Sequence, residues 1–270
     1  MVVQHNLSAM NTNRQMGVVT SALQKSTEKL SSGYKINRAG DDAAGLSISE
    51  KMRSQIRGLN KASDNAQDGI SLIQVAEGAL NETHSILQRM NELATQAAND
   101  TNTSVDRQSI KDEIEQLNEE LDRISTTTQF NKQDLLTGGF SGKLQVGALE
   151  GQTMDVKISL AVSAKGLNVS AVKVSTNVKA GDAMQSIQDA IESVSKQRSK
   201  LGAIQNRLEH TINNLDTNAE NTQAAESRIR DTDMADEMVQ YSKNNILSQA
   251  GQSMLTQANQ QTQGVLSLLQ

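Results

Sequence analysis

The residue types that most often perform chemistry are few and scattered in this sequence. His5, His84 and His210 lie far apart, and none belongs to an HExxH or other paired-ligand spacing. The chain has no cysteine, which excludes thiolate metal ligands and a disulfide framework. We therefore expect structural or solvated histidines rather than a metal site.

Asp41 and Asp42 are the most suggestive pair of acidic residues. Adjacent carboxylates could serve in acid–base catalysis, but at the start of a predicted helix they are more typical of an N-terminal cap. No set of residues offers a nucleophile, a base and an orienting partner, and no glycine-rich phosphate loop joins a strand to a helix. The sequence therefore favours a protein that is not an enzyme and needs no cofactor.

Composition narrows the class of protein further. The chain of 270 residues has 1% aromatic residues, no proline and a net charge of -5. Its core must come from aliphatic side chains and methionine, which suits thin helical bundles, and no proline breaks a long helix. The negative charge disfavours nucleic acid as a partner.

The sequence contains neither a membrane span nor a secretory signal. No stretch approaches the roughly 20 apolar residues that cross a bilayer. The segment from Met1 to Asn13 lacks the basic and apolar regions of a signal peptide. If the protein leaves the cell, a different export route must carry it.

The longest regular pattern runs from Leu46 to about Asn99. Mostly apolar residues recur at alternating steps of four and three, which indicates a helix packed lengthwise against other helices. At 1.5 Å per residue this helical rod would be roughly 80 Å long. The positions of this seam are Met52, Ile56, Leu59, Ser63, Ala66, Ile70, Ile73, Glu77, Leu80, His84, Leu87, Asn91 and Ala94.

Two further helical patterns supply packing partners for this rod. Ser104 can cap a helix that folds back on the rod as an antiparallel hairpin, with Ile110, Ile114, Leu117, Leu121 and Ile124 as its stripe. A second rod starts near Asp182 and keeps the same alternating step. Its stripe is Ile187, Ile191, Val194, Arg198, Leu201, Gln205, Leu208, Ile212, Leu215 and Ala219.

Between Gln129 and Lys179 the period of the pattern changes to two. Leu144 and Val146 alternate, as do Met154, Val156 and Ile158, and glycines punctuate these runs. The pattern predicts short strands in hairpins. Because the region is too small for a core of its own, we expect a small β tip that caps the rods.

The two ends of the chain carry thinner helical patterns, over residues 2–30 and 237–270. Each has too little apolar area to fold alone, and the last helix has no charged residue from Asn244 onward. We interpret these end helices as polymerisation elements that fold among neighbours. The candidate contact residues are Leu7, Met10, Val19, Leu23, Leu247, Met254, Leu255, Val265, Leu268 and Leu269.

The expected fold is mainly α. It is a long antiparallel bundle of helical rods with a small β-hairpin tip, plus paired terminal helices that form a coiled-coil-like inner domain. Residues 1–45 and 229–270, each an end helix with its connector, would form this inner domain. Residues 46–179 (first rod, hairpin helix and β tip) and 180–228 (second rod) would form the other domain.

Several segments resemble bacterial flagellin. They are LSSGYKIN at 30–37, DDAAGL at 41–46, LQRMNELA at 87–94, TQFN at 128–131, SRIRDTDMA at 227–235, ILSQAGQSML at 246–255 and VLSLL at 265–269. The matches are colinear and cover both ends of the chain. Only the short β region is unremarkable, which fits a flagellin that lacks the variable outer domains.

The resemblance implies a structural subunit of the extracellular flagellar filament used in motility. It implies export in the unfolded state through the flagellar type III apparatus, with an export chaperone, and self-assembly into a homopolymer under a cap protein. Terminal helices of this family form the inner tubes of the filament. A charge-free final helix near the axis would avoid repulsion between stacked subunits.

The resemblance also implies recognition by the innate-immune Toll-like receptor for flagellin. The matching positions are Arg89, Leu93 and Glu113, which we expect on an outer face of the first rod and its hairpin partner. Many stimulatory flagellins carry arginine where this chain has Asn91, so one guanidinium and its directed hydrogen bonds are lost.

Two alternative functions share parts of this pattern. A hook–filament junction protein would have similar end helices, but the match through the long rod and the final helix favours the filament subunit. A cytoplasmic coiled-coil adaptor would not need two end helices that cannot fold alone.

Overall fold

The computed structural model describes residues 6–267, and for residues 262–267 it describes the backbone only. The chain divides into two compact units. The terminal unit contains the chain up to Ser54 together with the chain from Asn221 onward, and the rod unit is Gln55–Glu220. Both divisions fall inside long helices rather than at the connectors, where the sequence pattern had placed the domain boundaries.

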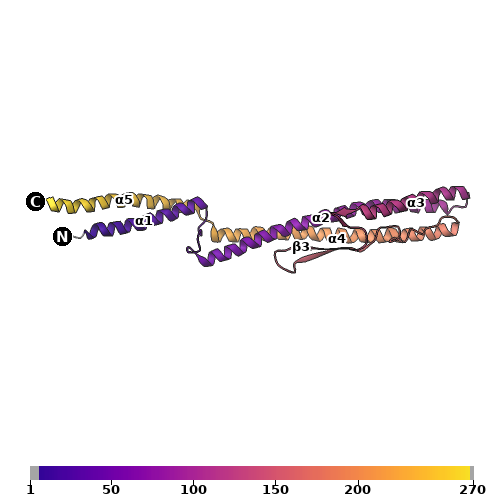
Figure 1. The fold of residues 1–270 in the computed structure, drawn as a ribbon, viewed down its shortest axis with the longest axis horizontal. Helices are drawn as coiled ribbons and strands as arrows, with labels where there is room; N and C mark the ends of the chain where they lie inside the picture. Colours follow the sequence, from indigo (N-terminus) through magenta and orange to yellow (C-terminus); the bar gives the residue numbers. More distant parts are fainter. Residues whose placement is uncertain (1–5, 268–270) are drawn as a thin grey trace. The chain divides into compact units, whose positions relative to one another are not determined.

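Three helices build the rod unit, which confirms the prediction of a mainly helical fold. They are α2 (Ala43–Ala97), α3 (Ser104–Thr127) and α4 (Asn177–Arg230). Within this unit α3 folds back on α2, and α4 runs alongside α2, where the Ser63 hydroxyl donates to Asp216 at 3.0 Å (Figure 1).

The buried face of α2 is wider than the single seam read from the sequence. Besides seam residues such as Leu80 and Leu87, a second row is buried, which includes Leu72, Met90 and Leu93. α2 buries two rows of side chains because it packs against two helices, α3 and α4. A helix that packs against one partner buries only a single row.

The start of α3 differs by one residue from the expected cap. Thr103, not Ser104, is the N-cap: its hydroxyl accepts from the Asp106 amide at 3.3 Å, and the Asp106 carboxylate accepts from the Thr103 amide at 2.9 Å. Hydrogen bonds from the side chain and amide of Thr103 lower the pKa of Asp106. This reciprocal pair is the capping box, and it fixes the turn between α2 and α3.

The strands form two small antiparallel pairs. β1 (Gln129–Phe130) pairs with β2 (Gln133–Asp134), and β3 (Phe140–Gln145) pairs with β4 (Thr153–Ile158). Alternate residues of β4 are buried, which confirms the period of two in that segment.

The β3–β4 hairpin lies against the sides of α2 and α4 and does not cap the tip of the rods, so that expectation was wrong. Leu144 packs so closely on Gly69 of α2 that a Cβ there would collide with it. From the other rod, the Gln197 side chain donates to the Lys157 carbonyl at 3.3 Å. The hairpin can bury its apolar face only against helices, and the sides of α2 and α4 provide that surface.

No strand follows β4 in the described chain, although the sequence predicted strands up to Lys179. Residues 159–176 form turns and irregular backbone with one isolated antiparallel bridge between Thr137 and Ala161, and α4 begins at Asn177 instead of near Asp182. The apolar residues of this loop still reach the core: Leu167, Val169 and Val174 are buried. The Val162 amide donates to the Leu136 carbonyl at 3.0 Å beside this bridge, and the Ala164 carbonyl accepts from two later amides, so one short pairing and local turns satisfy this backbone.

In the terminal unit α1 (Leu7–Ser32) and α5 (Met234–Ser267) lie side by side (Figure 1), and the unit also includes the first residues of α2 and the last residues of α4. Asn6 caps α1 by accepting from the Ala9 amide at 3.0 Å, and its side-chain amide donates to the Ala258 carbonyl at 2.9 Å. At the other end Gly33 adopts φ 75°, which permits the left-handed cap that ends α1.

Candidate assembly surface

The segments that join the terminal helices to the rods pair with each other through their backbones. Tyr34 and Asp231 form an antiparallel bridge. On either side of it, the Lys35 amide donates to the Arg230 carbonyl at 2.7 Å and the Thr232 amide donates to the Gly33 carbonyl at 3.0 Å. We call residues 33–35 and 230–232 the clasp, since they tie the first connector to the last one.

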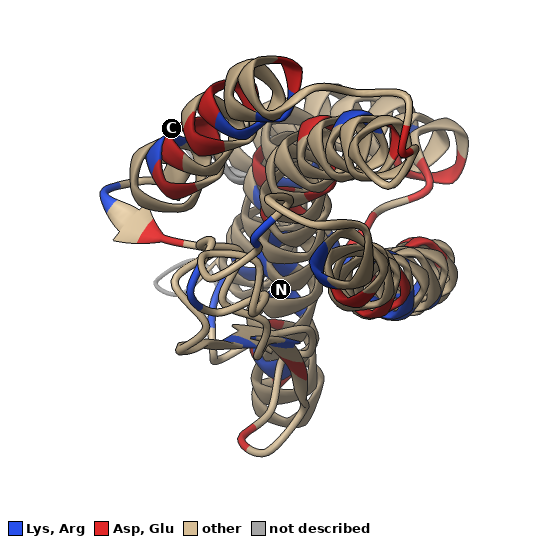
Figure 2. Cartoon of the chain, turned by 90° about the vertical axis from the view of Figure 1, so that its right-hand side faces the viewer, with Lys and Arg blue, Asp and Glu red and all other residues tan. Residues whose placement is uncertain are grey.

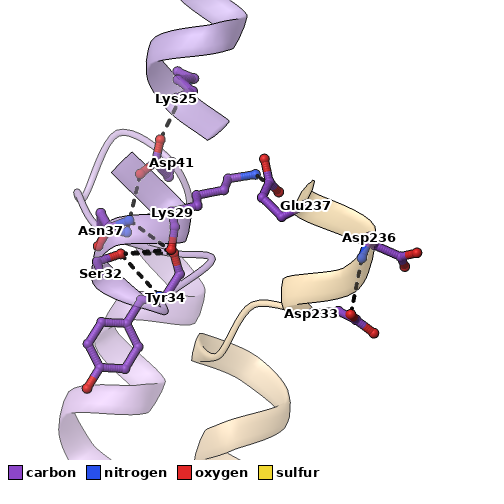
Figure 3. A network of polar contacts seen from close by, with 9 residues as sticks. All are labelled: Lys25, Lys29, Ser32, Tyr34, Asn37, Asp41, Asp233, Asp236 and Glu237. Carbon is purple, nitrogen blue, oxygen red and sulfur yellow. Dashed lines mark hydrogen bonds and ion pairs between the residues drawn. The ribbon is translucent and has the colours of Figure 1, made fainter. Parts of the chain in front are cut away.

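Side chains reinforce the clasp. The Arg230 guanidinium lies 4.5 Å from the centre of the Tyr34 ring, a cation–π contact, and its Nη1 donates to the buried Ser49 hydroxyl at 3.5 Å. Nearby, Lys29 of α1 pairs with Glu237 of α5 at 3.3 Å (Figure 3). These contacts hold the end of α1 against the beginning of α5.

The two adjacent acids have separate structural roles. Asp42 caps α2, because its carboxylate accepts from the Gly45 amide at 2.9 Å. The Asp41 carboxylate accepts from the amides of Arg38 at 3.1 Å and Asn37 at 3.4 Å, and it faces Lys25 (Figure 3). The Arg38 amide contributes most to lowering the pKa of Asp41. Both acids therefore shape the first connector.

The terminal helices bury very few side chains. Ser26 is the only buried residue that α1 contributes among its described positions, and Ala258 is the only one from the described side chains of α5. Large apolar side chains instead face solvent along both helices. This terminal apolar set consists of Leu7, Met10, Val18, Met234, Met238, Val239, Ile246, Leu247 and Met254.

The candidate contact residues fall into three groups. Leu7, Met10, Leu247 and Met254 are exposed, whereas Val19, Leu23 and Leu255 are half-buried. The side chain of Val265 and the whole of Leu268 and Leu269 lie outside the described residues.

The candidate contact residues leave out several apolar residues that are exposed, among them Val18, Val239 and Ile246. Each lies beside a residue of the stripe that was read as apolar, as in the Val18–Val19 and Ile246–Leu247 pairs. Two adjacent apolar residues in a helix project about 100° apart, so the pairs themselves are the signal of a second apolar face.

The C-terminal part of α5 has no charged residues. α5 carries none after Lys243, whereas acidic and basic residues are interspersed along other helices (Figure 2). Within the rod unit acidic residues outnumber basic ones, and in the rest of the chain the two nearly balance. The apolar set is therefore free of strong like-charge repulsion.

The residues matched to the receptor site lie on α2 and α3. Arg89 Nε donates to Glu113 at 3.0 Å, and Arg89 Nη1 donates to Glu92 at 3.2 Å. These carboxylates, Glu113 most of all, raise the pKa of Arg89. Leu93 is only 2% exposed and belongs to the core, so its expected place on an outer face was wrong. Its position in the second buried row of α2 is the reason.

The described residues contain no cluster of three or more His, Asp or Glu side chains able to hold a metal ion. His84 contacts the Gln88 side chain on the same helix at 3.0 Å. Within the same range, no helix combines the length and the apolar character needed to span a bilayer.

Two family descriptions match this chain. The bacterial flagellin N-terminal helical region matches residues 3–141, and the bacterial flagellin C-terminal helical region matches residues 184–269. Together they span most of the sequence, including both helices of the terminal unit. The chain belongs to the bacterial flagellin family, a structural protein family whose members form the extracellular flagellar filament.

Individual relatives agree with this assignment. A flagellin of Halalkalibacterium halodurans is 56% identical over 271 residues and covers 100% of both chains. The flagellar filament 31.3 kDa core protein of Treponema maltophilum is 51% identical over 286 residues, again with 100% coverage of both. The crystal structure of Bacillus cereus flagellin, 33% identical, matches with a TM-score of 0.51 over 60% of this chain and 94% of that one.

Proposed function

We propose that this chain is a filament subunit that polymerises through its terminal helices. The observation that carries the proposal is the terminal apolar set, which lies on the two helices that bury least within the subunit. Each square ångström of apolar surface removed from water contributes about 25 cal/mol. Further copies of the chain would cover this surface, and the uncharged end of α5 would let them approach closely.

Seeded growth tests this proposal. Purified subunits with filament fragments as seeds should form tubes visible by electron microscopy. Deletion of residues 2–30 or of residues 244–270 should abolish growth, while circular dichroism still reports a folded rod unit. Tubes from both deleted chains would overturn the role assigned to the ends.

A milder pair of variants separates assembly from folding. Val18→Ser combined with Ile246→Ser removes two exposed apolar side chains of the terminal helices and should slow growth by at least about tenfold, the factor that corresponds to roughly 1.4 kcal/mol. The matched control is Val178→Ser in α4, where the valine is 75% exposed. Equal growth of the variant and the control would contradict the proposal.

Charge placement gives a second test of the same surface. Gln257 and Gln260 are exposed on the uncharged part of α5. Replacing either with lysine should impair assembly or motility, because like charges would be brought together in every stacked subunit. Filaments that form normally would remove the electrostatic part of the argument.

Export and capping partners belong to the same proposal. An end helix that is not stable alone suits transit in the unfolded state with an export chaperone, followed by folding under a cap protein. We expect the chaperone to cover exposed apolar side chains of α5 such as Ile246, so a chain that lacks residues 244–270 should retain less chaperone in co-purification than the full chain does.

We also propose that the Arg89–Glu113 face is recognised by the Toll-like receptor for flagellin. Both side chains are about half exposed and joined across α2 and α3, so they present a fixed polar surface. Reporter cells treated with the wild type and with Arg89→Ala should differ in dose response. Equal potency, or no activity from either protein, would remove these residues from the proposal.

A further inference from the structure

We infer that Met10, Met234, Met238 and Met254 form an oxidation-sensitive set. In the unassembled subunit, a hydroperoxide such as hydrogen peroxide converts them to methionine sulfoxide and thereby blocks polymerisation. The inference rests on the proposed role of the terminal helices. It assigns a modification site to four exposed residues of the terminal helices.

The described methionines differ widely in residue exposure, and Met16, Met52 and Met184 are half-buried between the two extremes. Met10 is 67% exposed, Met254 57%, Met238 51% and Met234 48%, and all four lie on α1 or α5. Met90 in α2 and Met154 in β4 belong to the core of the rod unit and are 0% and 8% exposed. The susceptible methionines therefore coincide with the assembly surface, and the protected ones with the fold.

The reaction is a simple oxygen transfer. A sulfur lone pair attacks one peroxide oxygen, the O–O bond breaks, and a new S–O bond forms. The sulfur is oxidised by two electrons, and the departing hydroxide takes the remaining proton of the peroxide to leave as water. Because the chain has no cysteine, no thiol of this protein competes for the oxidant.

The product is unsuited to the contact it would have to make. A sulfoxide converts a flexible apolar side chain into a polar one with a strong hydrogen-bond acceptor. Covering that oxygen with apolar surface from a neighbouring subunit costs free energy unless a donor meets it. Four such groups in one subunit should prevent docking while leaving the buried core of the rods intact.

Peptide mapping after peroxide treatment tests the first half of the inference. Monomer treated for increasing times should gain one oxygen at the four exposed methionines well before Met90 or Met154. In assembled filaments the same four should be protected. Oxidation of Met90 as fast as Met10 would overturn the inference, and so would unchanged oxidation of the four in filaments.

Seeded growth of the same samples tests the second half. Oxidised monomer should elongate seeds at least about tenfold more slowly than untreated monomer, down to no growth at all, and treatment with methionine sulfoxide reductase should restore the rate. Circular dichroism should show an intact rod unit throughout. A normal growth rate after complete oxidation of the four would overturn the inference but leave the role of the terminal helices standing.

A matched variant removes the sulfur and keeps the volume. With Met10, Met234, Met238 and Met254 replaced by leucine, growth should be near that of the wild type and insensitive to peroxide, since leucine has similar size and no oxidisable atom. If peroxide slows this variant as much as the wild type, damage elsewhere is responsible. Failure of the polymerisation proposal would appear separately, as growth of the deleted chains without any oxidant.

Discussion

The two units of this molecule use the same kind of helix with opposite results. In the rod unit, Ile73, Leu80 and Leu201 have no exposed surface. In the terminal unit, equally large side chains such as Leu7 and Ile246 are mostly in solvent. The difference is the number of neighbours: α2 has α3 and α4 to cover two rows of side chains, whereas α1 and α5 have only each other.

Under the proposed mode of assembly, this contrast means that one unit folds within a subunit while the other gains stability from neighbouring subunits. A side chain that is covered on all sides contributes its full burial energy inside the subunit. A side chain that is half covered leaves part of that energy to be gained on polymerisation. The clasp and the Lys29–Glu237 pair then hold the terminal helices in place until neighbours arrive.

The largest effect that sharpens this comparison is on core stability. Leu80→Ala in the rod unit should lower the free energy of unfolding by about 2–5 kcal/mol, because it opens a cavity in a fully buried site. Leu247→Ala, at an exposed site in α5, should change the stability of the free subunit by less than about 0.5 kcal/mol yet slow seeded growth. Chemical denaturation and growth rates measure the two. A large loss of monomer stability from Leu247→Ala would break the comparison.

The clasp gives the next largest effect. Tyr34→Leu keeps an apolar side chain but removes the ring beneath the Arg230 guanidinium, which should cost about 1 kcal/mol. Hydrogen exchange should quicken in α1 and the start of α5, while α3 amides stay protected. Tyr241→Leu in α5 is the control for the loss of a tyrosine elsewhere in the same unit. Uniform deprotection of both units would mean that the clasp acts on the whole fold.

The periodic pattern predicted much of the secondary structure of the rods. The long helix was expected from Leu46 to about Asn99 and runs from Ala43 to Ala97, because its apolar spacing and terminal turn residues are local signals. The stripe of α3 is likewise buried or half-buried along its length.

Apart from small shifts at helix ends, such as the cap at Thr103, the misses are non-local. Nothing near Leu144 in the sequence indicates that its partner is Gly69 on the side of α2. The family resemblance placed Leu93 on an outer face, and packing against a second neighbouring helix buries it instead. Ile246 is the opposite case. It is exposed because α5 packs on α1 and, within the described chain, has no second helix beside it to cover its other apolar face.

Glycine-to-alanine substitutions in α1 and α2 compare the terminal and rod units through smaller changes in stability. A Cβ added at Gly17 in α1 or at Gly78 in α2 would meet no atom within 4 Å. Alanine at either position should therefore stabilise the free subunit by about 0.5–1 kcal/mol, through its higher helix propensity. Thermal unfolding measures this gain, and seeded growth should then separate the pair. If neighbouring subunits pack against α1 at Gly17, Gly17→Ala should slow seeded growth more than Gly78→Ala does. Equal growth of the two variants would contradict a subunit contact at Gly17.

The smallest expected effect concerns pH. The pKa of Asp41 is lowered below its ordinary value of 3.8, chiefly by the Arg38 amide, so the folded state favours the carboxylate. This contribution to stability is present above the unfolded pKa and is lost as the pH falls through the lower folded value.

Asp41→Asn removes the charge and keeps an acceptor of similar shape. The difference in melting temperature between this variant and the wild type should be greatest near neutral pH and should disappear once the pH has fallen below the lowered pKa of Asp41. Glu150→Gln, at an exposed acid in the turn between β3 and β4, is the control. A difference that persists undiminished in acid would show that the first connector depends on the shape of Asp41 and not on its charge. The terminal unit would then be held together, until neighbours arrive, by the backbone pairing of the clasp more than by the ionised side chains around it.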